Sequence, residues 1–167
     1  MKIINLIGFS GSGKTSFIIN AIKLLRTNLN YEIACIKNVH QHKIDEEGKD
    51  SFEFTKAGAR YSVIKNQFNE HAFYIKSKLD VKTIIEWIKK GPSRVDLIFL
   101  EGFRDIDYPT VLCVRDYKEI EHQLSDKVKM ISWILPSKDQ SPKEYNGIPL
   151  MDISKNFNDF LKIFEII

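Results

Sequence analysis

The sequence has few cysteines and no long apolar run, the features on which disulfide-linked and membrane-spanning proteins depend. Only two cysteines occur in 167 residues, Cys35 and Cys113, and each lies in a separate apolar run. Two distant thiols do not form a disulfide framework, so we expect both to be buried and reduced. No apolar run reaches the length of a membrane span, and the N-terminus enters a strand without the order of a signal peptide. We therefore expect a soluble, cytoplasmic protein with no membrane partner.

An excess of charge of one sign is also lacking. The formal net charge is +3, and the 25 lysines and arginines are spread along the chain. Without a basic run or stripe, a nucleic-acid partner is not expected, and a small anionic ligand fits better. The hydrophobic fraction of 43% is sufficient for one α/β domain over residues 1–167, since no linker divides the chain.

The chain does contain a complete phosphate-binding loop, Gly-Phe-Ser-Gly-Ser-Gly-Lys-Thr, at residues 8–15. An apolar strand at residues 3–7 precedes it and an amphipathic helix follows it, which argues against an accidental glycine-rich turn. Backbone amides of such a loop bind anions at a helix N-terminus, Lys14 is expected to reach the β and γ phosphates, and Thr15 to coordinate Mg²⁺. The residues predicted here to bind the ligand are Gly8, Ser10, Gly11, Ser12, Gly13, Lys14, Thr15 and Ser16.

The remaining pattern predicts an α/β fold of the P-loop NTPase type, with a mainly parallel sheet, flanking helices and a β-hairpin insertion. The second strand, at residues 31–36, is expected to form a right-handed β-α-β unit with the first. Later strands are expected at residues 95–101, 110–115 and 130–135, and hairpin strands at residues 61–65 and 72–75. Helices are expected from the phosphate loop to Asn28, at residues 51–57, after Asp80 and after Lys155.

The strand at residues 95–101 is apolar between two carboxylates and resembles a Walker B strand. Ligands of parallel sheets lie beyond the carboxyl ends of the strands, so Gly13, the segment from Lys37 and Glu101 are expected to converge. Glu101 is expected to hold Mg²⁺ through water or to orient an attacking water, with Gly102 beside the ligand. Glu101 and Lys14 are thus the candidate catalytic residues, and an exposed strand-end carboxylate is the alternative for Glu101.

Residues 37–50 form a polar segment longer than a usual connection, as functional loops often are. Lys37 is a candidate phosphate ligand, or else a solvated lysine. Asp45 and Asp50 are both candidates for contacting the metal or the γ phosphate, and Asp45 is the one assigned to the metal. The alternative for Asp50 is a helix cap just before Ser51.

The same segment holds a His-x-His pair, His40 and His42. No cysteine lies near enough to complete a zinc set, so we interpret His40 as a polar contact to an anionic ligand, or else as an ordinary loop residue, rather than as a transition-metal ligand.

Two segments are candidates for reading a nucleotide base. Residues 77–80, Ser-Lys-Leu-Asp, resemble the Asn-Lys-x-Asp motif of GTPases, but they precede the Walker B strand and open a helix, so we set them aside. Residues 136–139, Pro-Ser-Lys-Asp, follow the last strand and are better placed.

Taken together, the motifs resemble the molybdopterin-guanine dinucleotide biosynthesis protein B (MobB) family. The motifs that carry the resemblance are residues 8–15, Gly-Lys-Asp-Ser at residues 48–51, Ala-Gly-Ala at residues 57–59 and Leu-Glu-Gly-Phe at residues 100–103. The chain departs from the family pattern where Asn38 and Gln41 replace histidines and Arg104 replaces a lysine.

The resemblance implies a GTP-binding accessory protein with weak Mg²⁺-dependent GTPase activity. Such a protein assists the guanylyltransferase that attaches GMP to molybdopterin, and molybdopterin itself is a further candidate ligand. The resemblance also implies a homodimer in which the hairpin contributes to a shared sheet.

Two alternative functions remain open. A P-loop small-molecule kinase would need a lid bearing arginines, and the arginines of this chain do not cluster as one. A non-hydrolytic, nucleotide-gated adaptor that delivers molybdopterin to a partner would use the same phosphate-binding loop. It differs from the first function only in that GTP hydrolysis plays no part.

Overall fold

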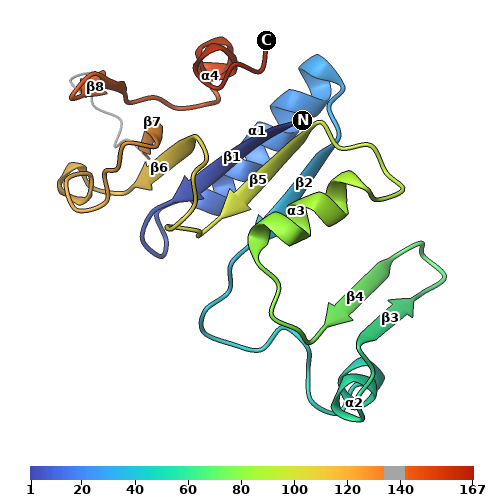
Figure 1. The fold of residues 1–167 in the computed structure, drawn as a ribbon. Coiled ribbons are helices and arrows are strands. Elements are labelled where there is room, and N and C mark those ends of the chain that lie inside the picture. Colours follow the sequence, from blue (N-terminus) through green and yellow to red (C-terminus); the bar gives the residue numbers. More distant parts are fainter. Residues whose placement is uncertain (134–141) are drawn as a thin grey trace. The chain divides into compact units, whose positions relative to one another are not determined.

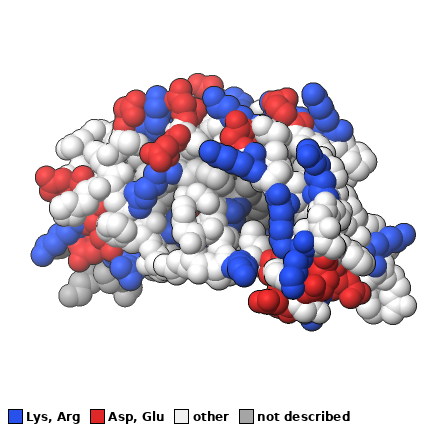
Figure 2. Space-filling model, turned by 60° about the horizontal axis from the view of Figure 1, so that its bottom comes forward, with Lys and Arg blue, Asp and Glu red and all other residues white. Residues whose placement is uncertain are grey.

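The computed structural model describes residues 1–133 and 142–167. The chain divides into two compact units, a first unit of residues 1–38 and 91–167 and a second unit of residues 39–90 (Figure 1). On the face drawn in Figure 2, basic and acidic side chains both appear, in keeping with their spread along the sequence.

The first unit is built around a parallel sheet of five strands in the order β2-β5-β1-β6-β7. Its strands are β1 (Lys2–Ile7), β2 (Ile33–Lys37), β5 (Leu97–Glu101), β6 (Thr110–Val114) and β7 (Val128–Trp133). All residues of β5 and β6 are buried, as expected for inner strands covered on both faces. The predicted α/β fold with a mainly parallel sheet is confirmed.

The two strands of the first β-α-β unit are parallel strands of one sheet with another strand between them. β5 lies between β1 and β2, so that Phe99 is opposite both Ile4 and Cys35. The first two strands are therefore not a hydrogen-bonded pair.

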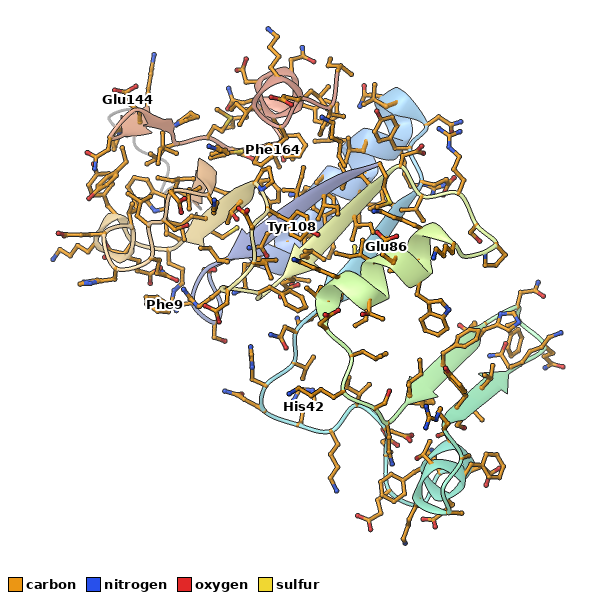
Figure 3. All side chains as sticks on the ribbon, viewed as in Figure 1. Phe9, His42, Glu86, Tyr108, Glu144 and Phe164 are labelled. Carbon is orange, nitrogen blue, oxygen red and sulfur yellow. The ribbon has the colours of Figure 1, made fainter. Side chains whose placement is uncertain are left out.

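Alternate strand residues pack into two separate apolar clusters, because successive side chains of a strand point to opposite faces. The first cluster joins Leu6 and Phe99 to helices α1 (Lys14–Leu29) and α4 (Phe157–Ile163). The ring centroids of Phe17 in α1 and Phe160 in α4 are 5.9 Å apart, and Phe164, labelled in Figure 3, belongs to the same cluster. The aromatic residues of the last helix are core residues, as predicted.

The second cluster lies on the other face and is formed by buried residues of β1, β6 and β7 with Ile120. Ile120 follows the 3₁₀ helix η1 (Tyr117–Glu119). Two short strands, β8 (Glu144–Tyr145) and β9 (Ile148–Pro149), add partly buried residues where only a loop was expected. The candidate base-reading residues 136–139 lie outside the described residues.

The second unit contains α2 (Asp50–Lys56), the antiparallel hairpin β3 (Tyr61–Lys65) and β4 (His71–Ile75), and α3 (Val81–Lys89). The predicted hairpin is confirmed, with Val63 opposite Phe73. Asp80 caps α3, since its Oδ1 accepts a hydrogen bond from the Thr83 amide at 2.7 Å. Residues 77–80 therefore lead into a helix, as predicted, with Asp80 at its N-cap.

The two cysteines have different surroundings, and neither is in a disulfide. Cys113 in β6 is buried as predicted, but Cys35 is exposed, so the prediction for Cys35 is wrong. The reason is the strand order, because β2 lies at the edge of the sheet. Among the helices of the described residues, none combines the length and the apolar character needed to cross a membrane.

Candidate phosphate-binding site

The loop between β1 and α1 is packed tightly against β6. A Cβ atom built on Gly8 would lie 2.3 Å from the carbonyl oxygen of Cys113 and 2.4 Å from Oγ of Ser12, so no larger residue fits there. Gly13 is the N-cap of α1 and has a left-handed backbone with φ 89°, which a glycine adopts without steric cost. The loop therefore turns directly into the first turn of α1.

The Lys14 side chain folds back over this loop. Its Nζ donates hydrogen bonds to the carbonyl oxygens of Gly8 and Phe9, both at 2.8 Å. Burial lowers the pKa of the ammonium group, and the nearby Glu101 carboxylate opposes that shift. Because burial disfavours this charge, an anion bound at the loop would stabilise it.

Glu101 meets two residues that the sequence predicted to converge with it. The Thr15 hydroxyl lies 3.3 Å from Oε1 and 3.2 Å from Oε2, and Nζ of Lys37 lies 3.1 Å from Oε1. Glu101 is only 8% exposed, so it is not the exposed carboxylate of the alternative interpretation. Register explains the convergence, since both Leu6, just before the loop, and Lys37 lie opposite Glu101 in the sheet.

Two hydrogen bonds join β1 to the residues that follow Glu101 at the end of β5. The Gly102 amide donates to the Leu6 carbonyl at 2.9 Å. Nδ2 of Asn5, a buried residue of β1, donates to the Phe103 carbonyl at 2.9 Å. Asn5 was not predicted as part of the site. The signal for it was a single amide inside an otherwise apolar strand.

Three predicted site residues, His40, Asp45 and Asp50, belong to the second unit. His40 is exposed, as is its neighbour His42, which Figure 3 labels on the segment before α2. Asp45 is 9% exposed, and its Oδ1 accepts a hydrogen bond from Oγ of Ser51 at 2.8 Å. Their predicted roles at the nucleotide remain predictions.

The helix-cap alternative for Asp50 is wrong. Asp50 is the first residue of α2, and Lys49 occupies the N-cap position. Within residues 1–133 and 142–167, no group of three or more His, Cys, Asp or Glu residues is arranged to hold a metal ion.

The residues present fit the phosphates and the magnesium ion that the loop implies. Oγ of Ser12 is buried and has no hydrogen-bond partner in the described part of the chain. A buried hydroxyl without a partner is uncommon, and a phosphate oxygen would satisfy it. The hydroxyl of Thr15 and the carboxylate of Glu101 are oxygen ligands of the kind Mg²⁺ prefers.

A family model described as molybdopterin guanine dinucleotide synthesis protein B (MobB) matches residues 3–135, which include this whole site. The chain belongs to the MobB family. The resemblance found in the sequence motifs is thereby confirmed, and it extends through all five strands of the sheet of the first unit.

Two curated relatives of this MobB-family chain are named molybdopterin-guanine dinucleotide biosynthesis adapter proteins. The protein of Haemophilus influenzae is 27% identical over 118 residues, covering 69% of this chain and 64% of the relative. That of Escherichia coli is 28% identical over 111 residues, covering 65% of this chain and 62% of the relative. The chain thus spans less than two thirds of the length of either relative.

A crystal structure of Bacillus subtilis MobB has a similar fold. It aligns with a TM-score of 0.76 at 22% sequence identity and covers 98% of each chain. At this identity the match shows a shared fold, here the P-loop α/β architecture.

Proposed function

We propose that this MobB-family chain is a GTP-binding accessory protein of molybdenum cofactor biosynthesis. It would assist the formation of molybdopterin guanine dinucleotide. The observation that carries the binding proposal is the cluster of Thr15, Lys37 and Glu101 at the phosphate loop, with distances of 3.1 to 3.3 Å between their polar atoms. The family match supports the choice of pathway and of guanine.

The triphosphate would lie on the phosphate loop at the start of α1. Backbone amides of the loop would bind its oxygens, and Lys14 would turn from the carbonyls it now contacts toward the β and γ phosphates. Lys37 and Gly102 border the same end of the sheet. The residues of the first unit that we propose as nucleotide ligands are Gly8, Ser10, Gly11, Ser12, Gly13, Lys14, Thr15, Ser16, Lys37 and Gly102. His40 and Asp50, in the second unit, stay candidates on the basis of the sequence alone.

Thr15 and Glu101 are the proposed magnesium ligands of the first unit, and Asp45, in the second unit, stays a candidate on the basis of the sequence alone. When bound, Mg²⁺ would neutralise charge on the phosphates. Glu101, held in place by Thr15 and Lys37, would orient the attacking water in a slow hydrolysis of GTP to GDP and phosphate. A carboxylate with two fixed neighbours is suited to positioning a water molecule.

The accessory role is tested with the guanylyltransferase of the pathway. We expect the chain to retain the transferase in a pull-down, and to do so differently with a nonhydrolysable GTP analogue and with GDP. Equal retention in both states would rule out nucleotide-dependent adaptor action. If Glu101→Gln, without hydrolysis, still promotes dinucleotide formation, the protein acts as a non-hydrolytic adaptor.

We also propose that the chain forms a homodimer through the β3–β4 hairpin. One side of this hairpin exposes the apolar residues Tyr61, Val63 and Phe73, and the Phe73 ring meets the exposed Trp87 edge-on at 6.1 Å between centroids. Exposed apolar patches mark interaction sites in many proteins. Sedimentation analysis of wild type and Val63→Glu tests this, and a wild type that sediments as a monomer at all concentrations would refute it.

The cytoplasm is the compartment we propose for this function. The two cysteines are free rather than paired with each other, in agreement with a reducing environment.

A further inference from the structure

We propose that Arg104 contacts the terminal phosphate of the bound nucleoside triphosphate, so that this chain distinguishes the triphosphate from the diphosphate through one of its own arginines. The inference rests on the proposed function, because it assumes that a nucleotide binds at the loop.

Arg104 lies beside the phosphate loop. It follows Glu101 by three positions, just past the end of β5. Its guanidinium carbon is 6.0 Å from the ring centroid of Phe9, an exposed residue of the loop that Figure 3 labels. The Phe9 carbonyl accepts one of the hydrogen bonds from Lys14. One loop residue thus contacts both cations.

The positive charge of Arg104 affects the ionisation of Lys14 in the phosphate loop. Burial is the main cause that lowers the pKa of Lys14, the Glu101 carboxylate opposes this shift, and the positive charges of Lys37 and Arg104 add smaller effects in the same direction as burial. Three cations around one loop repel one another, and that repulsion would be relieved by a polyanion.

Arg104 is held by a neutral side chain. Its Nη2 donates to Oε1 of Gln123 at 3.0 Å, and Gln123 is only 5% exposed. In the part of the chain that the structure describes, no carboxylate pairs with Arg104. The other arginines of the first unit all have such a partner: Arg26 with Glu32, Arg94 with Asp96 and Arg115 with Glu119.

Arg104 therefore differs from the other arginines of the first unit, whose charges are balanced by a carboxylate. A buried amide fixes the direction of the guanidinium group without neutralising its charge. Guanidinium groups bind phosphate oxygens through paired N–H donors, and phosphoryl-transfer proteins place such a group at the terminal phosphate. The terminal phosphate is the part of the triphosphate that a diphosphate lacks, so a contact there affects the affinity for only one of the two.

Calorimetric titration tests the inference with the full chain, Mg²⁺, and either a nonhydrolysable GTP analogue or GDP. For Arg104→Gln we expect the affinity for the analogue to fall by about tenfold or more, as for the loss of one charge-assisted hydrogen bond, and the affinity for GDP to change by less than about twofold. Arg104→Lys should retain part of the preference. The matched control is Arg26→Gln, which removes an arginine of the same unit that is paired with Glu32 and should change neither affinity.

Equal losses for the analogue and GDP, or no loss for either, would overturn the inference. If Arg104→Gln does not fold, Gln123→Glu provides a second variant, because it neutralises the guanidinium in place and should cause the same selective loss. A wild-type protein that binds neither nucleotide would instead refute the proposed function. Preference for an ATP analogue over ADP that disappears in Arg104→Gln would support the inference while refuting the proposed base.

Discussion

Thr15 and Glu101 are 86 positions apart in the sequence, and the Thr15 hydroxyl lies 3.3 Å and 3.2 Å from the two carboxylate oxygens of Glu101. The contact joins the first turn of α1 to the last residue of β5. A hydroxyl and a carboxylate thus meet beside a loop whose lysine already contacts two backbone carbonyls.

Glu101→Gln should separate nucleotide binding from hydrolysis. The amide keeps the shape of the side chain but loses the charge that positions water and Mg²⁺. We expect GTP hydrolysis to slow by roughly 100-fold or more, the usual contribution of a positioned carboxylate, and binding without Mg²⁺ to persist. Single-turnover hydrolysis measures this. The matched control is Asp96→Asn, which removes a carboxylate just before the other end of β5 and should leave hydrolysis unchanged. If Glu101→Gln hydrolyses GTP as fast as Asp96→Asn does, Glu101 takes no part in the reaction.

Lys14→Met should abolish nucleotide binding while the fold persists. Methionine keeps the apolar stem and removes the ammonium group that would meet the phosphates. Fluorescence titration with a labelled GTP checks the loss of binding, and thermal unfolding checks the fold. Lys23→Met changes an exposed lysine of the same helix and should bind normally. Retained binding by the Lys14 variant would show that the loop is not the nucleotide site.

Gly8→Ala should destabilise the protein more than Gly11→Ala. Both glycines have positive φ, so each substitution strains the backbone, but only at Gly8 would the new Cβ come within 2.3 Å of a backbone carbonyl oxygen. At Gly11 the nearest atom, in the Arg115 side chain, is 3.6 Å away. We expect the larger loss of unfolding free energy for Gly8→Ala in urea denaturation. Equal losses would mean that the loop is not packed against β6 as described.

Cys113 should make the protein less stable as the solution becomes alkaline. Burial raises the pKa of its thiol from 9.0 to about 12. Between these values the unfolded chain loses the proton and the folded chain keeps it, so the free energy of unfolding falls as pH rises, by at most about 1.4 kcal/mol per pH unit. Cys113→Ala should remove this contribution to the fall of the unfolding free energy above about pH 9. Below that pH the dependence of the unfolding free energy on pH should stay unchanged. Urea denaturation across this range measures it, and an unchanged alkaline slope would contradict the burial of the thiol.

The parts of the site that depend on local pattern could be predicted from the sequence. A strand, a glycine-rich loop and an amphipathic helix are adjacent in the chain, so spacing alone indicates residues 8–15. Glu101 could be placed with them because parallel strands direct their carboxyl ends to one edge of the sheet. The same rule brought Lys37 to the site.

The order of strands depends on distant pairing and was not evident. β5 lies between β1 and β2, and the run of four apolar residues before Glu101 indicates a buried strand but not its neighbours. The exposure of Cys35 follows from the edge position that this leaves to β2. β8 and β9 have two residues each, too few for an alternating pattern. The contact of Arg104 with Gln123 joins two segments without periodicity, so only the structure reveals it.

Calorimetric titration of the wild-type chain with GTP and with ATP, each with Mg²⁺, is the most direct measurement of the proposed function. We predict one molecule of GTP bound per chain, tighter binding with Mg²⁺ than without it, and an affinity for ATP lower by about tenfold or more, the scale of a hydrogen-bonded base contact. No heat of binding with GTP, or tighter binding of ATP, would contradict it.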